Sequence, residues 1–154
     1  MRKKISGLVG ALLCGVLLCG CGNKTVSFDV SALGNDLKSQ IVYQDELMEL
    51  DADTASMFLN LSDIDIVNSA IYEGSGATAE EIVVLECSSA DEASKAKSML
   101  EDRVKEQKES FTDYVPGELT KLDAAVIKSA GNYAILSVSD DSSKASSIID
   151  GYIK

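Results

Sequence analysis

The chain has 154 residues, of which 25 are acidic and 14 are basic, and its formal net charge is −11. It contains no histidine, which excludes Ser-His-Asp and Cys-His catalytic arrangements and histidine-based zinc sites. A nucleic acid is disfavoured as a partner, because its phosphates would be repelled by the acidic chain. The length suits one domain.

The start of the chain has the pattern of a bacterial lipoprotein signal. Basic residues at positions 2–4 precede an apolar run over residues 5–19, which is shorter than the roughly 20 residues that a membrane-spanning helix needs. The run ends in the lipobox-like sequence Leu18-Cys19-Gly20-Cys21. We therefore expect signal-peptide cleavage between Gly20 and Cys21, and a diacylglycerol on the Cys21 thiol.

This anchor predicts where the protein lies. Residues 1–20 would be the signal peptide, and residues 21–28 the lipidated cysteine with a short tether. Because two acyl chains hold a protein durably on a bilayer, we expect attachment to the extracytoplasmic face of the cell membrane, with an envelope protein or a wall component as partner. Cleavage would change the net charge to −14, which keeps the domain off anionic head groups. The alternative, an uncleaved anchor in which Cys21 is incidental, places the domain on the same side.

The cysteines carry a second prediction. Three of the four lie within the first 21 residues, which leaves Cys87 as the free thiol of the mature chain. No internal disulfide is then possible, so the domain must be stabilised by its hydrophobic core. We interpret Cys87, which ends an apolar segment, as an inert buried thiol. Beyond the lipid on Cys21, no cofactor is expected.

The first half of the domain begins with a helix. Asp29 is a favourable N-cap, and apolar residues at helical spacing follow it, which predicts a helix over 29–39. A strand is expected from Ile41 towards residue 48, although residues 46–50 also suit a helix. Two segments rich in β-branched residues, 64–72 and 80–87, flank Gly74-Ser75-Gly76 and predict an antiparallel pair.

The second half contains a long helix and a hairpin. Ser89 and Glu92 form a capping box that predicts a helix over 90–110, and Pro116 prevents its continuation. Segments 124–129 and 133–139 flank a glycine turn and predict a hairpin. A terminal helix follows from the capping sequence Asp140-Asp141-Ser142.

The expected order is therefore α-β-β-β-α-β-β-α. Strands joined by tight turns favour antiparallel pairing. Each amphipathic helix has one apolar face, which it buries by packing against the sheet. We predict a single α+β domain over residues 29–154, a two-layer arrangement in which the helices pack on one face of an antiparallel sheet.

From Gln44 onward the chain resembles the bacterial surface lipoproteins known as domain of unknown function 4358, which are typical of Gram-positive anaerobes. The residues that carry the resemblance are Asp45-Glu46-Leu47 with Leu50, Gly76-Ala77, Glu80-Glu81-Ile82, Arg103, Gln107, Phe111, Tyr114-Val115-Pro116, Val126 and Gly131-Asn132-Tyr133. The resemblance implies a surface location and a compact α+β fold. It implies no activity and no catalytic residues.

A carboxylate-based envelope hydrolase is one alternative function. Glycosides are cleaved by two carboxylates without histidine, and here Asp45 or Glu46 would act against Asp63 or Glu80. The absence of tryptophan, a common sugar platform, argues against this interpretation.

A weak calcium site is the other alternative. Its candidate ligands alternate in two short acidic segments: Asp51 with Asp53, and Asp63 with Asp65. An EF-hand loop beginning at Asp51 would need glycine at its sixth position and glutamate at its twelfth, and serine stands at both. Acids in exposed turns are the default interpretation.

A recognition surface is suggested by Arg103, Gln107 and Tyr114, which lie on the second half of the long helix and just beyond it. Arginine presents a planar fork to carboxylates, but such residues also tie a helix to its neighbours, and we favour that structural role. The sequence as a whole thus predicts a non-enzymatic binding or accessory module at the cell envelope.

Overall fold

The computed structural model describes residues 25–154. It contains one five-stranded sheet in the order β1-β2-β3-β5-β4, with every neighbouring pair antiparallel. The strands are β1 Met48–Glu49, β2 Ile66–Glu73, β3 Glu81–Cys87, β4 Val126–Ala130 and β5 Tyr133–Val138. The helices are α1 Val30–Gln40, α2 Ala52–Leu59, α3 Ala90–Tyr114, α4 Leu119–Asp123 and α5 Ser142–Ile153, with 3-10 turns at Leu61–Asp63 and Pro116–Glu118.

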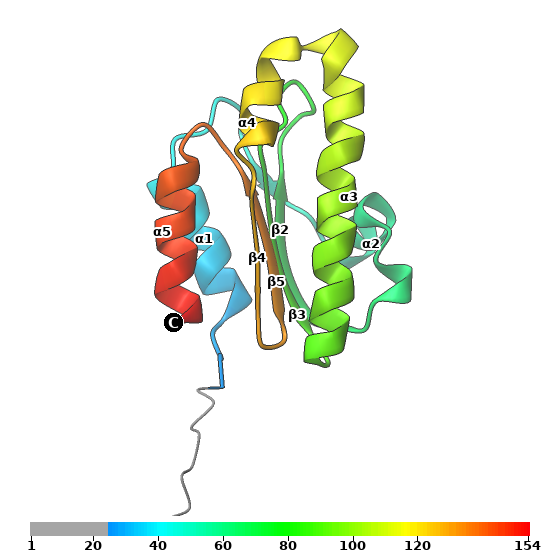
Figure 1. Cartoon of the computed structure of the whole chain (residues 1–154), viewed down its shortest axis with the longest axis vertical. Coiled ribbons are helices and arrows are strands. Elements are labelled where there is room, and N and C mark those ends of the chain that lie inside the picture. Colours follow the sequence, from blue (N-terminus) through cyan, green and yellow to red (C-terminus); the bar gives the residue numbers. More distant parts are fainter. Residues whose placement is uncertain (1–24) are drawn as a thin grey trace, which may run out of the picture.

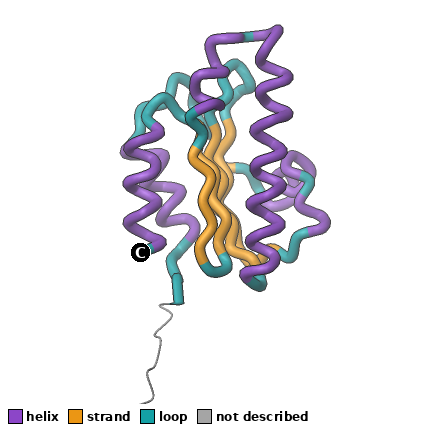
Figure 2. Tube along the Cα trace, viewed as in Figure 1, coloured by secondary structure: helices purple, strands orange, loops and turns teal. Residues whose placement is uncertain are grey.

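Helices cover both faces of the sheet. Helices α1 and α5 lie on one side, and α3 with α2 and α4 on the other (Figures 1 and 2). Successive residues of β3 alternate accordingly: Val83 and Leu85 belong to the core under α3, whereas Ile82 and Val84 belong to the core under α1. The layers are therefore helix, sheet and helix.

The antiparallel sheet and the α+β class are confirmed, but the expected packing of all helices on one face is wrong. Strands β3 and β5 are buried along almost their whole length, so both of their faces need apolar cover. Tight turns indicate how strands pair, but they do not determine on which side of the sheet a helix packs. The second apolar face of β3 was the missed signal.

Two short helices and the extent of the first strand were also not predicted. Helix α2 begins after Asp51, whose carboxylate accepts hydrogen bonds from the backbone N–H and the hydroxyl of Thr54. Pro116 ends α3 as expected, but it also opens the 3-10 turn that leads into α4, because proline is favoured in a first helical turn. The expected strand from Ile41 is reduced to the two residues of β1.

The folded domain begins before Asp29. The Phe28 ring stacks on Tyr133 at 4.0 Å between centroids, and its backbone N–H donates to the Tyr133 hydroxyl at 3.3 Å. Val26 also packs on the core under α1 and α5. The predicted tether, residues 21–28, therefore contributes its last residues to the domain. None of the helices within residues 25–154 is long and apolar enough to cross a membrane.

One glycine allows α1 to approach the sheet closely. A Cβ at Gly34 would lie 2.7 Å from Cε2 of Tyr72, a side chain that is buried under α1. We expect Gly34→Ala to lower the free energy of unfolding by about 1–3 kcal/mol through overpacking. The control is Gly151→Ala on α5, where the space is open and the same change should stabilise by about 0.5–1 kcal/mol. Urea unfolding checks both, and an equal effect at the two positions would contradict the close contact.

Candidate functional site

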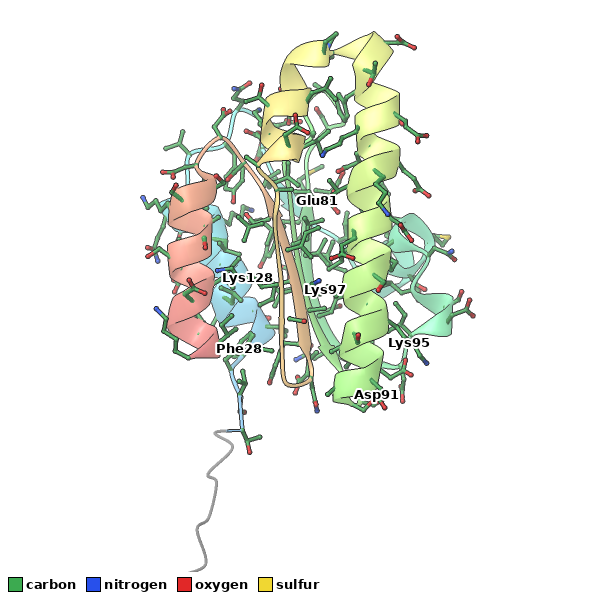
Figure 3. All side chains as sticks on the ribbon, viewed as in Figure 1. Phe28, Glu81, Asp91, Lys95, Lys97 and Lys128 are labelled. Carbon is green, nitrogen blue, oxygen red and sulfur yellow. The ribbon has the colours of Figure 1, made fainter. Side chains whose placement is uncertain are left out.

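The candidate site lies at the end of the domain opposite its first described residues. Helix α3 runs along the sheet for 25 residues, about 37 Å at 1.5 Å per residue. The chain enters the domain beside α1 and α5, where Figure 3 labels Phe28, at the same end of the domain as the start of α3 but across the sheet from it. Helix α3 ends at Tyr114, at the opposite end of the domain (Figure 1). The turn between β2 and β3 lies at the same far end (Figure 1).

A cavity of about 300 Å³ lies between the last turns of α3 and the β2–β3 turn. Phe111 is buried, whereas Tyr114 at the helix end is 69% exposed, and their ring centroids are 6.3 Å apart. The side of the cavity formed by the sheet and the turn contributes a carboxyl and a hydroxyl. The lining residues are Glu73, Gly76, Thr78, Gln107, Ser110, Phe111 and Tyr114.

An ion cluster lies beside this cavity, between the sheet and α3. Arg103 donates from Nε to Glu81 at 2.6 Å and from a terminal nitrogen to Glu73 at 3.4 Å. Glu73 and Glu81 are directly paired across β2 and β3, and Figure 3 shows Glu81 between the sheet and α3. The Arg103 guanidinium also stacks on the Phe58 ring of α2 at 4.3 Å. One guanidinium is thus paired with two carboxyl groups, so the cluster would lack one positive charge if both carboxyls were ionised.

Two oxygen atoms of this cluster have no hydrogen-bond partner among the described residues. Gln107 donates from Nε2 to Glu81 at 3.1 Å, so its Oε1 faces away from that carboxylate and is unpartnered. The Oε2 of Glu73 is also buried without a partner. Both atoms belong to side chains that line the cavity. Buried polar groups are normally hydrogen-bonded, so these two oxygens are candidates for contact with a ligand.

The surroundings of Glu73 change its titration. Burial, reinforced by the negative charge of Glu81, raises the pKa of Glu73 to about 8, although Arg103 opposes the shift. Burial also raises the pKa of Glu81, against the effect of Arg103 and Gln107. The raised pKa values mean that the Glu73–Glu81 pair holds one proton at neutral pH. We assign this proton to Glu73, because Arg103 makes its shorter contact with Glu81 and so favours the ionised form of Glu81.

This titration predicts a pH dependence of stability. The folded state retains the Glu73 proton up to about pH 8, whereas the unfolded chain releases it near pH 4.5. The stabilisation is therefore complete below pH 4.5 and is lost as the pH rises towards 8. We expect the free energy of unfolding to fall by more than about 1 kcal/mol over this range, and Glu73→Gln to flatten the decline. Urea unfolding at several pH values measures it, and an unchanged slope in the variant would contradict the assignment.

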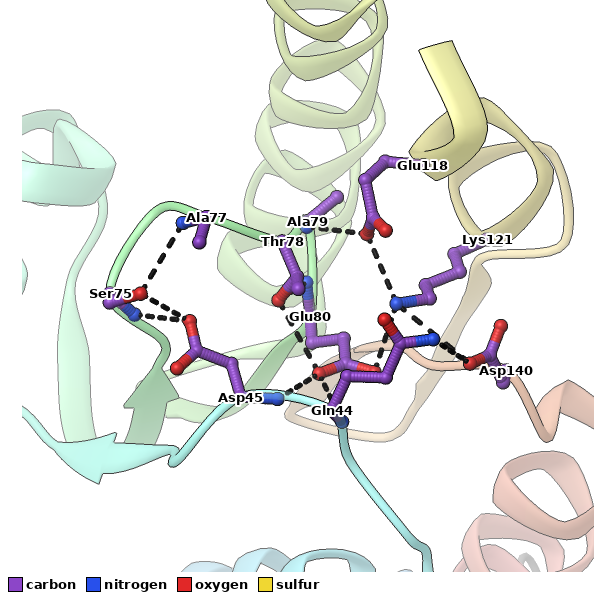
Figure 4. Close-up of polar contacts among 10 residues, drawn as sticks. All are labelled: Gln44, Asp45, Ser75, Ala77, Thr78, Ala79, Glu80, Glu118, Lys121 and Asp140. Atoms are coloured by element: carbon purple, nitrogen blue, oxygen red, sulfur yellow. Dashed lines mark hydrogen bonds and ion pairs between the residues drawn. The ribbon is translucent and has the colours of Figure 1, made fainter. Parts of the chain in front are cut away.

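A second, fully satisfied ion cluster lies at the same end of the sheet (Figure 4). The Lys121 side chain of α4 is 3% exposed, and its ammonium lies 3.1 Å from carboxylate oxygens of both Glu80 and Glu118. The other oxygen of Glu80 accepts backbone N–H bonds from Gln44 and Asp45 at 2.8 and 2.9 Å. Glu118 accepts the backbone N–H of Ala79 at 2.9 Å.

This cluster ties separate segments together. It joins the loop before β1, the end of the β2–β3 turn, and α4 with the turn before it, and Asp140 after β5 lies 3.8 Å from the same ammonium. Glu80 is 1% exposed and both of its oxygens are bonded, so it offers no free oxygen to a substrate. Asp45, the first of its proposed partners, accepts from the backbone N–H and the hydroxyl of Ser75.

The proposed calcium ligands are not brought together. Asp51 caps α2, and Asp53 lies in the first turn of that helix. Asp63 ends the 3-10 turn, and Asp65 lines a separate groove beside β2. No three Asp, Glu, His or Cys side chains within residues 25–154 form a group able to hold a metal ion.

The structure places two of the three predicted recognition residues at the cavity. Gln107 and Tyr114 line it, whereas Arg103 lies beside it and is engaged by Glu73 and Glu81, which is a structural role. Glu73 was not singled out from the sequence. The sequence did offer one indication that Glu73 is buried: it ends a strand and lies two residues after Ile71, so it shares the face of the sheet on which Ile71 is buried. Gly20 and Cys21 lie outside the described residues.

The fold and the site define a class: an α+β domain with an antiparallel sheet between two helical layers, and a cavity at one end. The chain belongs to the family described as domain of unknown function (DUF4358), whose family model matches residues 40–139. The match confirms the resemblance found in the sequence and includes both ion clusters apart from Asp140. No curated protein and no solved structure was found to match the chain.

Proposed function

We propose that this protein is a lipid-anchored, non-enzymatic binding module on the extracytoplasmic face of the cell membrane, and that the cavity at the end of α3 is its contact site. The observation that carries the proposal is that Glu73 and Gln107, two side chains that line the cavity at the end opposite Phe28, each bury an oxygen that has no hydrogen-bond partner within residues 25–154. An anchor at Cys21 would place this cavity away from the bilayer.

The distance favours a partner in the envelope rather than a lipid. Helix α3 alone separates the two ends by about 37 Å. The net charge of −14 after cleavage also repels anionic head groups. The cavity would therefore face the wall or the outer part of another envelope protein.

The rival function, a carboxylate hydrolase, receives less support. Such an enzyme needs two carboxylates that reach the substrate, and the buried, fully bonded Glu80 does not meet this requirement. A zymogram with cell-wall substrate tests the rival directly. Clearing by the wild-type chain, abolished by Asp45→Asn or Glu80→Gln, would favour the hydrolase and contradict our proposal.

Site-specific photo-crosslinking in intact cells tests the binding function. A photoreactive amino acid replaces Tyr114 at the cavity rim, and in the matched control it replaces Met57, which is 80% exposed on α2. We expect a discrete cross-linked envelope component from position 114 and none from position 57. No product at position 114, or the same products from both positions, would overturn the proposed contact site.

A further inference from the structure

We propose that the cavity at the end of α3 binds a primary ammonium group carried on an aliphatic chain. This inference rests on the proposed function and names the chemistry of its ligand. It starts from two buried atoms of lining side chains that have no hydrogen-bond partner among the described residues: a carboxyl oxygen of Glu73 and the amide oxygen of Gln107. An amide oxygen is an acceptor, and an ionised carboxylate is an acceptor as well, so the complementary ligand is a hydrogen-bond donor.

The charge of the site points to a cation. Glu73 and Glu81 share Arg103 as their positive partner, so the ionised cluster carries one negative charge in excess. The charged groups that face Glu73 are Glu81 on β3 and Arg103 on α3, while β1 places Met48 opposite it. A bound cation would neutralise the charge of the carboxylate that Arg103 leaves without a counter-charge.

The geometry favours ammonium over guanidinium. A guanidinium binds a carboxylate best through two parallel hydrogen bonds. That arrangement is unavailable here, because Arg103 already engages Oε1 of Glu73, and both oxygens of Glu81 are bonded to Arg103 and Gln107. An ammonium has three separately directed donors, which suit one carboxylate oxygen, one amide oxygen and a nearby hydroxyl.

The rest of the lining suits the aliphatic chain. The Thr78 hydroxyl is already bonded to Glu80, whereas Ser110 donates to the Glu106 carbonyl at 3.0 Å and its oxygen can still accept, so Ser110 would supply the third acceptor. The rings of Phe111 and Tyr114 supply apolar walls and cation–π attraction. A volume of about 300 Å³ accommodates a chain of a few methylene groups. The chemistry is shared by two sources, a free alkyl amine and a lysine side chain, which the experiment separates.

Binding is measured by calorimetry and by amide NMR on the purified full chain. The free-amine arm compares 1-aminopentane with 1-pentanol, and the lysine arm compares Nα-acetyl-lysine N-methylamide with its norleucine analogue. We expect at least one amine to bind with a dissociation constant of about 1 mM or below and to shift the Gln107 side-chain amide, with at least tenfold weaker binding of its neutral counterpart.

The variants and the pH profile identify the site. Glu73→Gln should weaken amine binding about tenfold or more, and Tyr114→Ala should weaken it by a smaller factor, whereas Met57→Ala should leave it unchanged. Because the cation displaces the Glu73 proton, the affinity should rise about tenfold or more between pH 6 and 8 and then level off. A merely structural role of Glu73 would not produce this profile.

Three results would overturn the inference: no binding of either amine, equal binding of the neutral analogues, or full affinity in Glu73→Gln. Unfolding curves of each variant at the assay pH show whether a loss of binding reflects loss of structure. If the amines fail but the cross-link at position 114 persists, the proposed function stands and only the ligand class is wrong. If both fail, the contact site itself is wrong.

Discussion

Replacing Lys121 with alanine is expected to lower the free energy of unfolding by about 3–5 kcal/mol, the usual cost of removing one partner from a buried ion pair. The Lys121 ammonium is almost fully buried and lies 3.1 Å from Glu80 and from Glu118. Without it, two buried carboxylates would face each other with no counter-charge. Urea unfolding at pH 7 measures the change.

The control for this variant is a lysine whose ion pair is exposed. Lys105 contacts Asp102 at 2.7 Å on the outer surface of α3, with both side chains about 70% exposed. Such a pair contributes little to stability, so Lys105→Ala should leave the unfolding midpoint nearly unchanged. Adding Glu80→Gln and Glu118→Gln to Lys121→Met should restore part of the lost stability, because the two buried carboxylates that lack a counter-charge are then replaced by neutral amides. A Lys121→Ala variant as stable as the wild type would contradict the role of this cluster.

Replacing Cys21 with serine is expected to abolish lipid attachment completely. The lipobox places the thiol of Cys21 at the position that receives the diacylglycerol, and serine lacks the sulfur that this linkage requires. Each buried methylene contributes about 0.8 kcal/mol to membrane binding, so the loss of both acyl chains removes the anchor of the mature protein. Metabolic labelling with a fatty-acid analogue and mass spectrometry measure the outcome: the wild type should carry label and lack residues 1–20, and the variant should carry none and keep them.

Cys19→Ser is the matched control for this experiment. It changes a neighbouring cysteine to the same residue within the same motif, and small residues are accepted before the modified position. This variant should be labelled and processed like the wild type. Label that persists in Cys21→Ser, or an unmodified thiol at Cys21 in the wild type, would remove the basis for the envelope location.

The two proposals depend on different parts of the chain. The location rests on residues 1–21, outside the described structure, and the ligand class rests on Glu73 and Gln107 inside it. The amine experiment therefore remains informative if the anchor prediction fails. Conversely, loss of lipid in Cys21→Ser would support the location without testing the cavity.

Features fixed by residues close together in the chain were predicted from the sequence more fully than features fixed by residues far apart. Asp29, Ser89 and Asp141 cap α1, α3 and α5 with bonds that reach only two or three residues along the chain. Such capping can be recognised in a single sequence, and the starts of these three helices were predicted close to where they are observed. Helix α2 has the same kind of cap at Asp51, but its eight residues are too few to show a clear apolar period.

What the sequence by itself determined is the set of main elements, their antiparallel pairing and the family, because caps, turns and strand composition act locally. Only the tertiary structure decided that helices cover both faces of the sheet, and which residues come together to form the site. Glu81 and Arg103 are 22 residues apart, and Glu80 and Lys121 are 41 apart. Their contacts depend on which face of the sheet α3 covers, and packing of the whole core decides that.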